Sequence, residues 1–145
     1  MTIMTAEDMQ RLGEAIGRQL HGGENIELIG DVGAGKTTLT KGIARGLGVT
    51  DNITSPSFTI SCNYSGRDGL IMRHYDFYRL NDPGIMSMEL AESLGDKKSV
   101  NIVEWTDSVK SILPDDRITV RINYLPEAGR EVQISGPLDQ TRLMN

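Results

Sequence analysis

GDVGAGKT, residues Gly30 to Thr37, is the stretch that decides the fold, because it matches the pattern G-x-x-x-x-G-K-[ST] at every fixed position. Glycines let the backbone turn tightly and bring successive N–H groups toward phosphate oxygens. Lys36 places a positive charge beside the β and γ phosphates of a nucleotide, and the Thr37 hydroxyl is an oxygen ligand of the kind that Mg²⁺ prefers. The stretch therefore predicts a nucleotide-binding loop.

The residues on either side of the loop supply the context that such a loop requires. Asn25 to Ile29 are typical of a short strand, and a helix is expected from about Lys36 to Leu47, with Leu39, Ile43 and Leu47 on one face. The start of that helix directs N–H groups and the positive end of its dipole toward a bound anion. Strand, glycine loop and helix in this order argue against a glycine-rich turn with an incidental lysine.

The rest of the chain predicts one α/β domain over residues 1–145, with a core of about residues 5–135 and a loose C-terminal tail from Leu138. The expected architecture is a three-layer domain like that of P-loop NTPases, with a mixed, partly antiparallel sheet. Further strands are expected at Phe58–Tyr64, Leu70–Phe77, Ser99–Val103, Arg117–Tyr124 and Arg130–Ser135. Further helices are expected at Thr5–Leu20, from the Asn81–Gly84 turn to about Leu94, and shortly before Pro114.

Composition narrows the class of protein. The formal net charge of −5 and the pI of about 5.0 disfavour stand-alone binding to DNA or RNA, because phosphate backbones repel an acidic protein. The single cysteine, Cys62, cannot form an internal disulfide or a multi-cysteine metal site. No secretory signal is visible in Met1 to Gln10, and no apolar run is long enough to span a membrane, so a cytoplasmic location is expected.

Two carboxylates are candidates for the metal side of a nucleotide site, because each stands at the end of an expected strand. Glu104 follows Val100 to Val103, which resembles a Walker B strand with Glu in place of the usual Asp. Asp76 follows the strand that begins at Leu70. From the residues alone, Glu104 could equally be a surface carboxylate, and Asp76 could be a turn or cap residue.

Three further features allow a functional and a structural interpretation. The hydroxyls of Thr54 to Phe58 could reach magnesium or the γ-phosphate, or the segment could be a plain loop. Trp105 could stack on a base or lie in the core. His74 has no visible partner cluster and is expected to be structural.

Several segments together resemble the TsaE family, the small bacterial ATPases of tRNA threonylcarbamoyladenosine biosynthesis. The resemblance covers roughly Thr5 to Ser135, with Val32 and Ser57 as conservative departures from residues common in the family. The matching segments are Gly30–Thr38, Thr54–Phe58, His74-Tyr75-Asp76-Phe77-Tyr78-Arg79-Leu80 and Glu104-Trp105.

The resemblance implies roles for individual residues toward ATP or ADP and Mg²⁺. Lys36, Asp76 and Glu104 would be catalytic, and Thr37 and Glu104 would lie on the magnesium side. The residues implied to bind the nucleotide are Thr5, Asp31, Gly33, Ala34, Gly35, Lys36, Thr37, Thr38, Ser55, Trp105 and Arg130.

The resemblance also implies partners. The family acts with TsaD and TsaB, whose complex attaches the threonylcarbamoyl group to adenosine 37 of ANN-decoding tRNAs, and ATP hydrolysis supports turnover of that assembly. The subunit itself would meet tRNA only indirectly, through the complex. A small-molecule kinase, or a regulatory module that binds nucleotide without significant hydrolysis, remains the alternative. Phosphate release measured with and without the partners distinguishes these functions.

Overall fold

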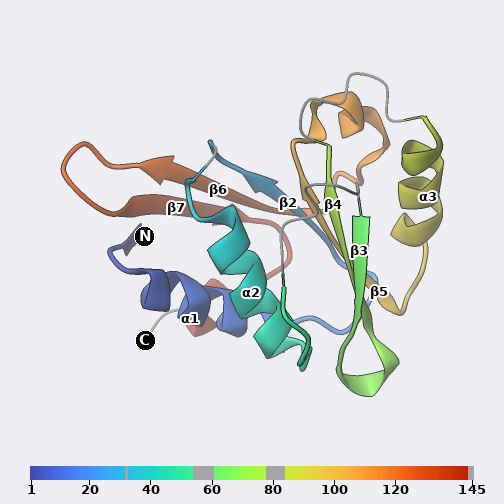
Figure 1. Ribbon diagram of the computed structural model, residues 1–145, viewed down its shortest axis with the longest axis horizontal. Coiled ribbons are helices and arrows are strands. Elements are labelled where there is room, and N and C mark those ends of the chain that lie inside the picture. The colour runs from blue at the N-terminus through green and yellow to red at the C-terminus, as the bar shows by residue number, and fades with distance from the viewer. Residues whose placement is uncertain (32, 54–60, 78–83, 144–145) are drawn as a thin grey trace.

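The structure is a computed structural model that describes residues 1–31, 33–53, 61–77 and 84–143. Within these residues, a sheet of seven strands runs in the order β1-β7-β6-β2-β5-β4-β3 (Figure 1). The strands are β1 (Thr2–Ile3), β2 (Asn25–Ile29), β3 (Ser61–Ser65), β4 (Ile71–Asp76), β5 (Ser99–Glu104), β6 (Ile118–Tyr124) and β7 (Arg130–Ser135). The α-helices are α1 (Ala6–Arg18), α2 (Lys36–Gly46) and α3 (Ile85–Leu94).

The sheet is mixed, as the sequence predicts. Strands β4, β5, β2 and β6 are parallel neighbours, whereas β3 pairs with β4, β7 with β6, and β1 with β7 in the antiparallel sense. The loop after β2 therefore leaves the carboxyl edge of the parallel part, next to the ends of β4 and β5. Ligands of open α/β sheets bind at this edge, outside the carboxyl ends of the strands.

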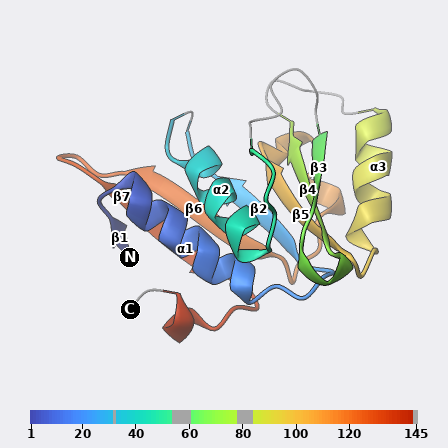
Figure 2. The same cartoon turned by 60° about the horizontal axis from the view of Figure 1, so that its bottom comes forward.

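Two apolar clusters lie on opposite faces of the sheet, because successive side chains of a strand point to opposite sides. On one face, α1 and α2 pack against residues such as Ile26, Ile102 and Val120. On the other face, Leu90 of α3 packs with Tyr75 and Val103. Figure 2 shows α1 and α2 in front of β2, β6 and β7, and α3 beside β4 and β5. The expectation of a three-layer α/β domain is confirmed.

Three details differ from the sequence prediction. The helix expected before Pro114 is a pair of 3-10 turns, Thr106–Ser108 and Lys110–Ile112. Strand β1 was not predicted, since two residues are too few for a periodic pattern. The tail from Leu138, which is expected to be loose, packs against the domain as far as Leu143. Leu143 is only 3% exposed and belongs to the larger core cluster. None of the helices in the described part of the chain is long and apolar enough to cross a lipid bilayer.

Helices α1 and α2 lie in backbone contact along a line of four glycines, two on each helix: Gly13, Gly17, Gly42 and Gly46. A Cβ atom placed on Gly13 would overlap the carbonyl oxygen of Leu39, and one placed on Gly42 would overlap that of Gln10. Any side chain at these positions would therefore push the helices apart. Because α2 begins at the loop and α1 begins beside it, this contact sets the distance across the nucleotide-binding region.

We expect Gly42→Ala to lower the free energy of unfolding by about 1–3 kcal/mol, the usual cost of forcing extra atoms into a packed interface. Denaturant unfolding measures the change. Gly95→Ala is the matched control, because Gly95 has an ordinary φ of −92° and a Cβ there would meet its nearest atom at 3.9 Å. Equal losses of stability in the two variants would contradict the role given to the glycine contact.

Candidate nucleotide-binding site

The loop between β2 and α2 has the backbone geometry that a phosphate cradle needs. Gly33 has a φ of 80° and Gly35 a φ of 119°, which are left-handed values that side chains disfavour. Gly35 is the N-cap of α2, and its carbonyl oxygen accepts the hydrogen bond from the N–H of Leu39 at 2.9 Å. The glycines of the motif are therefore required where the chain turns into the helix.

Lys36 is the first residue of α2, and its side chain is buried at the carboxyl edge of the sheet, with only 6% of the residue exposed. Its Nζ donates to the carbonyl oxygen of Gly30 at 2.5 Å and lies 3.9 Å from Oε1 of Glu104. Burial lowers the pKa of Lys36 below its ordinary value, while the negative charges of Glu104, Asp76 and Asp31 act in the opposite direction. The ammonium group is thus surrounded by acceptors and acids, at the place where the loop can hold phosphates.

Glu104 and Asp76 stand side by side at the ends of parallel strands β5 and β4, where the register pairs them directly. Glu104 is 3% exposed, and its Oε2 lies 2.5 Å from Nε2 of His74. His74 is fully buried, two residues before Asp76 on β4 and so on the same face of the sheet. The partner of His74 that the sequence does not show is Glu104, which the pairing of β4 with β5 brings beside it.

Trp105 follows Glu104 directly and is partly buried. Its ring centroid lies 3.7 Å from Nζ of Lys36, a cation–π arrangement that fixes one side of the ammonium group. Its φ of 54° is a left-handed value, which is uncommon for a bulky side chain and typical of functional sites. Lys36, Glu104, His74 and Trp105 thus form one cluster at the carboxyl edge of the sheet.

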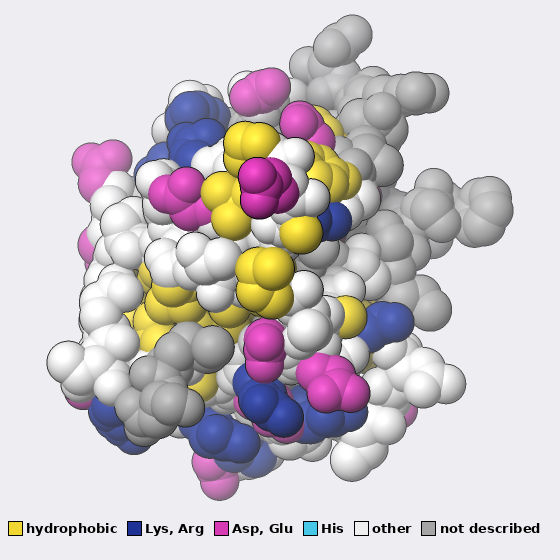
Figure 3. Space-filling view, turned by 90° about the vertical axis from the view of Figure 1, so that its left-hand side faces the viewer, with side chains coloured by type: hydrophobic (Ala, Val, Ile, Leu, Met, Phe, Trp, Pro, Cys, Tyr) yellow, Lys and Arg dark blue, Asp and Glu magenta, His cyan; other side chains and the backbone are white. Residues whose placement is uncertain are grey.

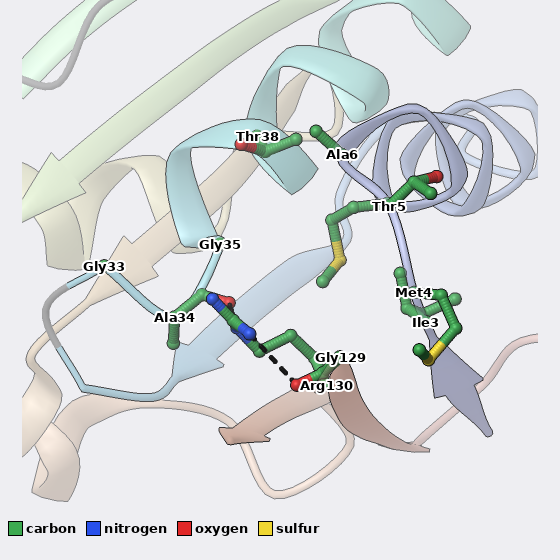
Figure 4. Close-up of a pocket in the computed structure, with 11 residues that line it drawn as sticks. Ile3, Met4, Thr5, Ala6, Gly33, Ala34, Gly35, Thr38, Gly129 and Arg130 are labelled. Carbon is green, nitrogen blue, oxygen red and sulfur yellow. Dashed lines mark hydrogen bonds between the residues drawn. The ribbon is translucent and has the colours of Figure 1, made fainter. Parts of the chain in front are cut away.

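A pocket of about 190 Å³ lies between the start of α1 and the loop (Figure 4). Ile3, Met4 and Met9 give it an apolar wall. The other residues that line it are Thr5, Ala6, Gly33, Ala34, Gly35, Thr38, Gly129 and Arg130. Such a mostly apolar hollow with backbone groups at its rim suits a flat heterocycle such as a nucleotide base.

Thr5 and Arg130 hold this pocket in shape from opposite sides. The Thr5 hydroxyl accepts from the N–H of Asp8 at 3.0 Å, which makes Thr5 the N-cap of α1. The side chain of Arg130 reaches from β7 to the loop, where its Nε donates to the carbonyl oxygen of Ala34 at 3.0 Å (Figure 4). The Arg130 guanidinium also lies 4.2 Å from the ring centroid of Tyr124. Arg130 therefore braces the loop against the β6–β7 hairpin.

Two further hollows adjoin the loop. Thr37 lines a hollow of about 170 Å³ together with Gly33, Gly35, Lys36 and Thr38, directly over the start of α2. Asp31 lines a different, more polar hollow of about 330 Å³, which also contains Lys36 and Trp105. Lys36 thus lies at the boundary between the two.

The structure gathers most of the residues that the sequence singled out, but it separates them into two groups. Thr5 and Arg130 lie at the pocket beside α1, whereas Asp76, Glu104 and Trp105 lie around Lys36. Ser55 and the rest of the Thr54–Phe58 segment lie outside the described residues, as do Val32 and Tyr78–Leu80. Sequence reasoning missed Ile3 and Met4 as parts of the apolar wall, because a two-residue strand gives no periodic signal. Met9 lies on the apolar face of the helix predicted over Thr5–Leu20, but only the fold brings it beside the loop.

The side-chain oxygens near Lys36 fit a magnesium ion that takes its other ligands from phosphates. In the part of the chain that the structure describes, no three His, Cys, Asp or Glu side chains form a metal-binding group by themselves. Mg²⁺ bound to a nucleotide needs only one or two protein oxygens, since phosphates and water supply the rest. The Thr37 hydroxyl with the carboxylates of Glu104 and Asp76 meets that need.

The fold and the loop define the class: this is a P-loop α/β protein with a pocket beside its glycine loop. A family model described as "Threonylcarbamoyl adenosine biosynthesis protein TsaE" matches residues 3–132. The chain therefore belongs to the TsaE family.

Individual relatives agree with this assignment. The chain is 36% identical to the tRNA threonylcarbamoyladenosine biosynthesis protein TsaE of Treponema pallidum over 136 residues, which cover 90% of this chain and 96% of the relative. It is 42% identical to the protein of the same name in Streptomyces coelicolor over 119 residues, 79% and 78% of the two chains. The crystal structure of Bacillus subtilis YdiB superposes with a TM-score of 0.75 at 30% identity, covering 94% of this chain and 83% of the other.

The hydrogen bond between His74 and Glu104 makes a stability prediction. His74→Phe fills the volume but removes a donor from a buried carboxylate, and we expect it to lower the free energy of unfolding by about 1.5–3 kcal/mol. His74→Gln keeps a donor and should lose less. Denaturant unfolding of both variants measures the difference, and equal stabilities would show that the hydrogen bond contributes nothing.

Proposed function

We propose that this protein binds ATP with Mg²⁺ and hydrolyses it as an accessory subunit in the formation of N6-threonylcarbamoyladenosine at position 37 of ANN-decoding tRNAs. Its partners would be homologues of TsaD and TsaB, whose turnover the hydrolysis supports. The observation that carries the proposal is the arrangement of Lys36 on the glycine loop, facing Glu104 at the end of the neighbouring strand. Membership of the TsaE family supplies the pathway.

Each of the two groups of residues would bind a different part of the nucleotide. The base would occupy the pocket beside α1, against Met9 and the backbone near Thr5, while the phosphates would lie over the start of α2. Backbone N–H groups at Gly33 to Thr38 then point to phosphate oxygens. Lys36 would leave the carbonyl oxygen of Gly30 and donate to the β and γ phosphates, exchanging a neutral acceptor for a charged one.

Thr37 and Glu104 would hold Mg²⁺, with Asp76 beside them at the end of β4. The ion would neutralise the charge that develops between the β and γ phosphates during transfer to water. Glu104 is held in place by His74, and Asp76 lies next to Glu104 by strand register, so one or both carboxylates can orient the attacking water. The products are ADP and inorganic phosphate.

We expect ATP hydrolysis to depend on partners because of the contacts that the Lys36 ammonium group makes in the chain alone. The ammonium group is engaged by Gly30, Glu104 and the Trp105 ring at the same time. The contacts of the ammonium group with Gly30 and Glu104 must loosen before the γ-phosphate is held for hydrolysis, and a partner that favours the loosened arrangement would accelerate turnover. We therefore expect slow hydrolysis by the chain alone.

Contact with tRNA would be indirect, and no DNA or membrane partner is proposed. The net charge of −5 opposes binding to a nucleic acid. Figure 3 shows the side of the molecule on the left of Figure 1, where acidic and basic side chains alternate around apolar ones and form no basic field. We expect a protein with a role in tRNA modification to act in the cytoplasm.

Two substitutions separate binding from hydrolysis. We expect Lys36→Ala to weaken ATP binding by about a hundredfold, because loss of charge-assisted contacts to phosphate costs about 3 kcal/mol. Glu104→Gln keeps the shape of the side chain and should bind ATP while losing hydrolysis, because it lacks the charge on the metal side. Lys41→Ala, an exposed position on the same helix, is the control. Calorimetric titration and phosphate release measure the two properties, and full turnover in both site variants would contradict the assignment.

The pathway role needs a separate experiment. Phosphate release is measured for the chain alone and with the purified TsaD and TsaB homologues, and we expect the partners to stimulate it. Transfer of the γ-phosphate to a metabolite instead of water would support a kinase. Binding of ATP without stimulated release would support a regulatory module. Either result would overturn the proposed function.

A further inference from the structure

Trp105 has a backbone conformation that must be held by its surroundings. Its φ of 54° and ψ of 61° lie in the left-handed region, where a side chain crowds its own backbone. Such residues persist only when neighbouring contacts over-determine the conformation. Trp105 is also the only tryptophan of the chain, so its fluorescence reports this one position.

The contacts that hold the turn come from the opposite side of the sheet. The hydroxyl of Thr106, the residue after Trp105, donates a short hydrogen bond to Oε2 of Glu27 on β2. Nε of Arg117 donates to Oε1 of the same carboxylate at 2.9 Å, and its NH1 group donates to the carbonyl oxygen of Pro114 at 2.9 Å. Glu27, Thr106 and Arg117 therefore form an anchor that joins β2 to the start of the first 3-10 turn and to the segment that follows the second.

This anchor buries charged groups. Buried charges destabilise the fold unless each one is paired and hydrogen-bonded. Glu27 is 2% exposed and Thr106 is 7% exposed. Burial alone would raise the pKa of Glu27, but the hydrogen bonds from Thr106 and Arg117 outweigh burial and hold that pKa below its ordinary value. The carboxylate is thus ionised, and both of its oxygens are engaged.

The position of Trp105 matters because its ring lies against the ammonium group of Lys36. The ring centroid lies 3.7 Å from Nζ of Lys36, while Glu104 lies 3.9 Å away from the same nitrogen. If the turn at Trp105 relaxed to a right-handed conformation, the ring would leave the ammonium group and Lys36 would gain rotamers. A Lys36 side chain that is already confined loses less conformational entropy when it binds phosphates, and it therefore binds them more tightly.

We propose that the anchor of Glu27, Thr106 and Arg117 positions Trp105 against Lys36 and thereby presets Lys36 for the phosphates of ATP. The inference rests on the proposed function, which it extends to residues on the other face of the sheet. Glu27, Thr106 and Arg117 are positioning residues, since they act through Trp105 and not on the nucleotide.

The first measurement needs no nucleotide. Thr106→Val keeps the shape of the side chain and removes the donor, and we expect quenching of Trp105 fluorescence by acrylamide to increase. Thr106→Ser restores the hydroxyl and should return the quenching to the wild-type value. Thr119→Val is the matched control, because Thr119 lies opposite Glu27 on β6 and makes no hydrogen bond through its side chain in the described structure. Unchanged quenching in Thr106→Val would overturn the anchor.

The second measurement is the affinity for ATP with Mg²⁺, determined by calorimetry. We expect Thr106→Val to weaken binding about tenfold and Thr106→Ser to restore it, since a hydrogen bond to a charged group is worth about one such factor. Wild-type affinity in a folded Thr106→Val variant would overturn the positioning role. If that variant does not fold, Glu27→Gln, which still accepts from Thr106 but lacks the charge that Arg117 needs, provides the same comparison.

The two measurements keep the inference separate from the function on which it rests. A wild-type protein that binds no ATP would overturn the proposed function, and fluorescence quenching would still decide whether the anchor holds Trp105. A wild-type protein that binds ATP, with a Thr106→Val variant that folds but binds more weakly, would support both.

Discussion

The backbone contact between α1 and α2 is the constraint on which the rest of the structure depends. Four glycines let the helices approach until carbonyl oxygens of one helix lie where side chains of the other would be. Thr5 and Met9 of α1 are thereby brought beside the loop that opens α2, and the pocket between them has the size of a nucleotide base. A greater separation would move Thr5 and Met9 away from the loop, so the same four glycines determine both the helix packing and the width of the pocket.

A second constraint is electrostatic and lies at the carboxyl edge of the sheet. Lys36 and Glu104 are both nearly inaccessible to solvent, and burying a charge is expensive unless it is paired. The structure offsets the cost with His74 on one oxygen of Glu104 and with the Trp105 ring and the Gly30 carbonyl on Lys36. A site that holds its charges in this way is ready for a highly charged ligand, because a phosphate oxygen can replace the Gly30 carbonyl as the acceptor of the Lys36 ammonium group.

Sequence reasoning identified the parts whose signals are local. The loop motif, the strand before it, the helix after it, and the carboxylates at two strand ends all follow from short patterns, and the structure places them as expected. The partner of His74 could not be found from the sequence, because Glu104 is thirty residues away and only the parallel pairing of β4 with β5 brings them together. The Glu27 anchor was missed for the same reason, since a charged residue inside a strand pattern shows nothing about the partners that neutralise it across the fold. Functional roles in tRNA modification came from family resemblance, since geometry alone indicates only a nucleotide.

The central claim is that the glycine loop holds the triphosphate of ATP with Lys36 as its cation. A crystal structure of the protein grown with Mg²⁺ and a non-hydrolysable ATP analogue tests it most directly. The expected result places the β and γ phosphates over the start of α2, with Nζ of Lys36 moved from the Gly30 carbonyl to phosphate oxygens and the base against Met9. An analogue bound elsewhere, with Lys36 still on Gly30 and the loop empty, would contradict the account.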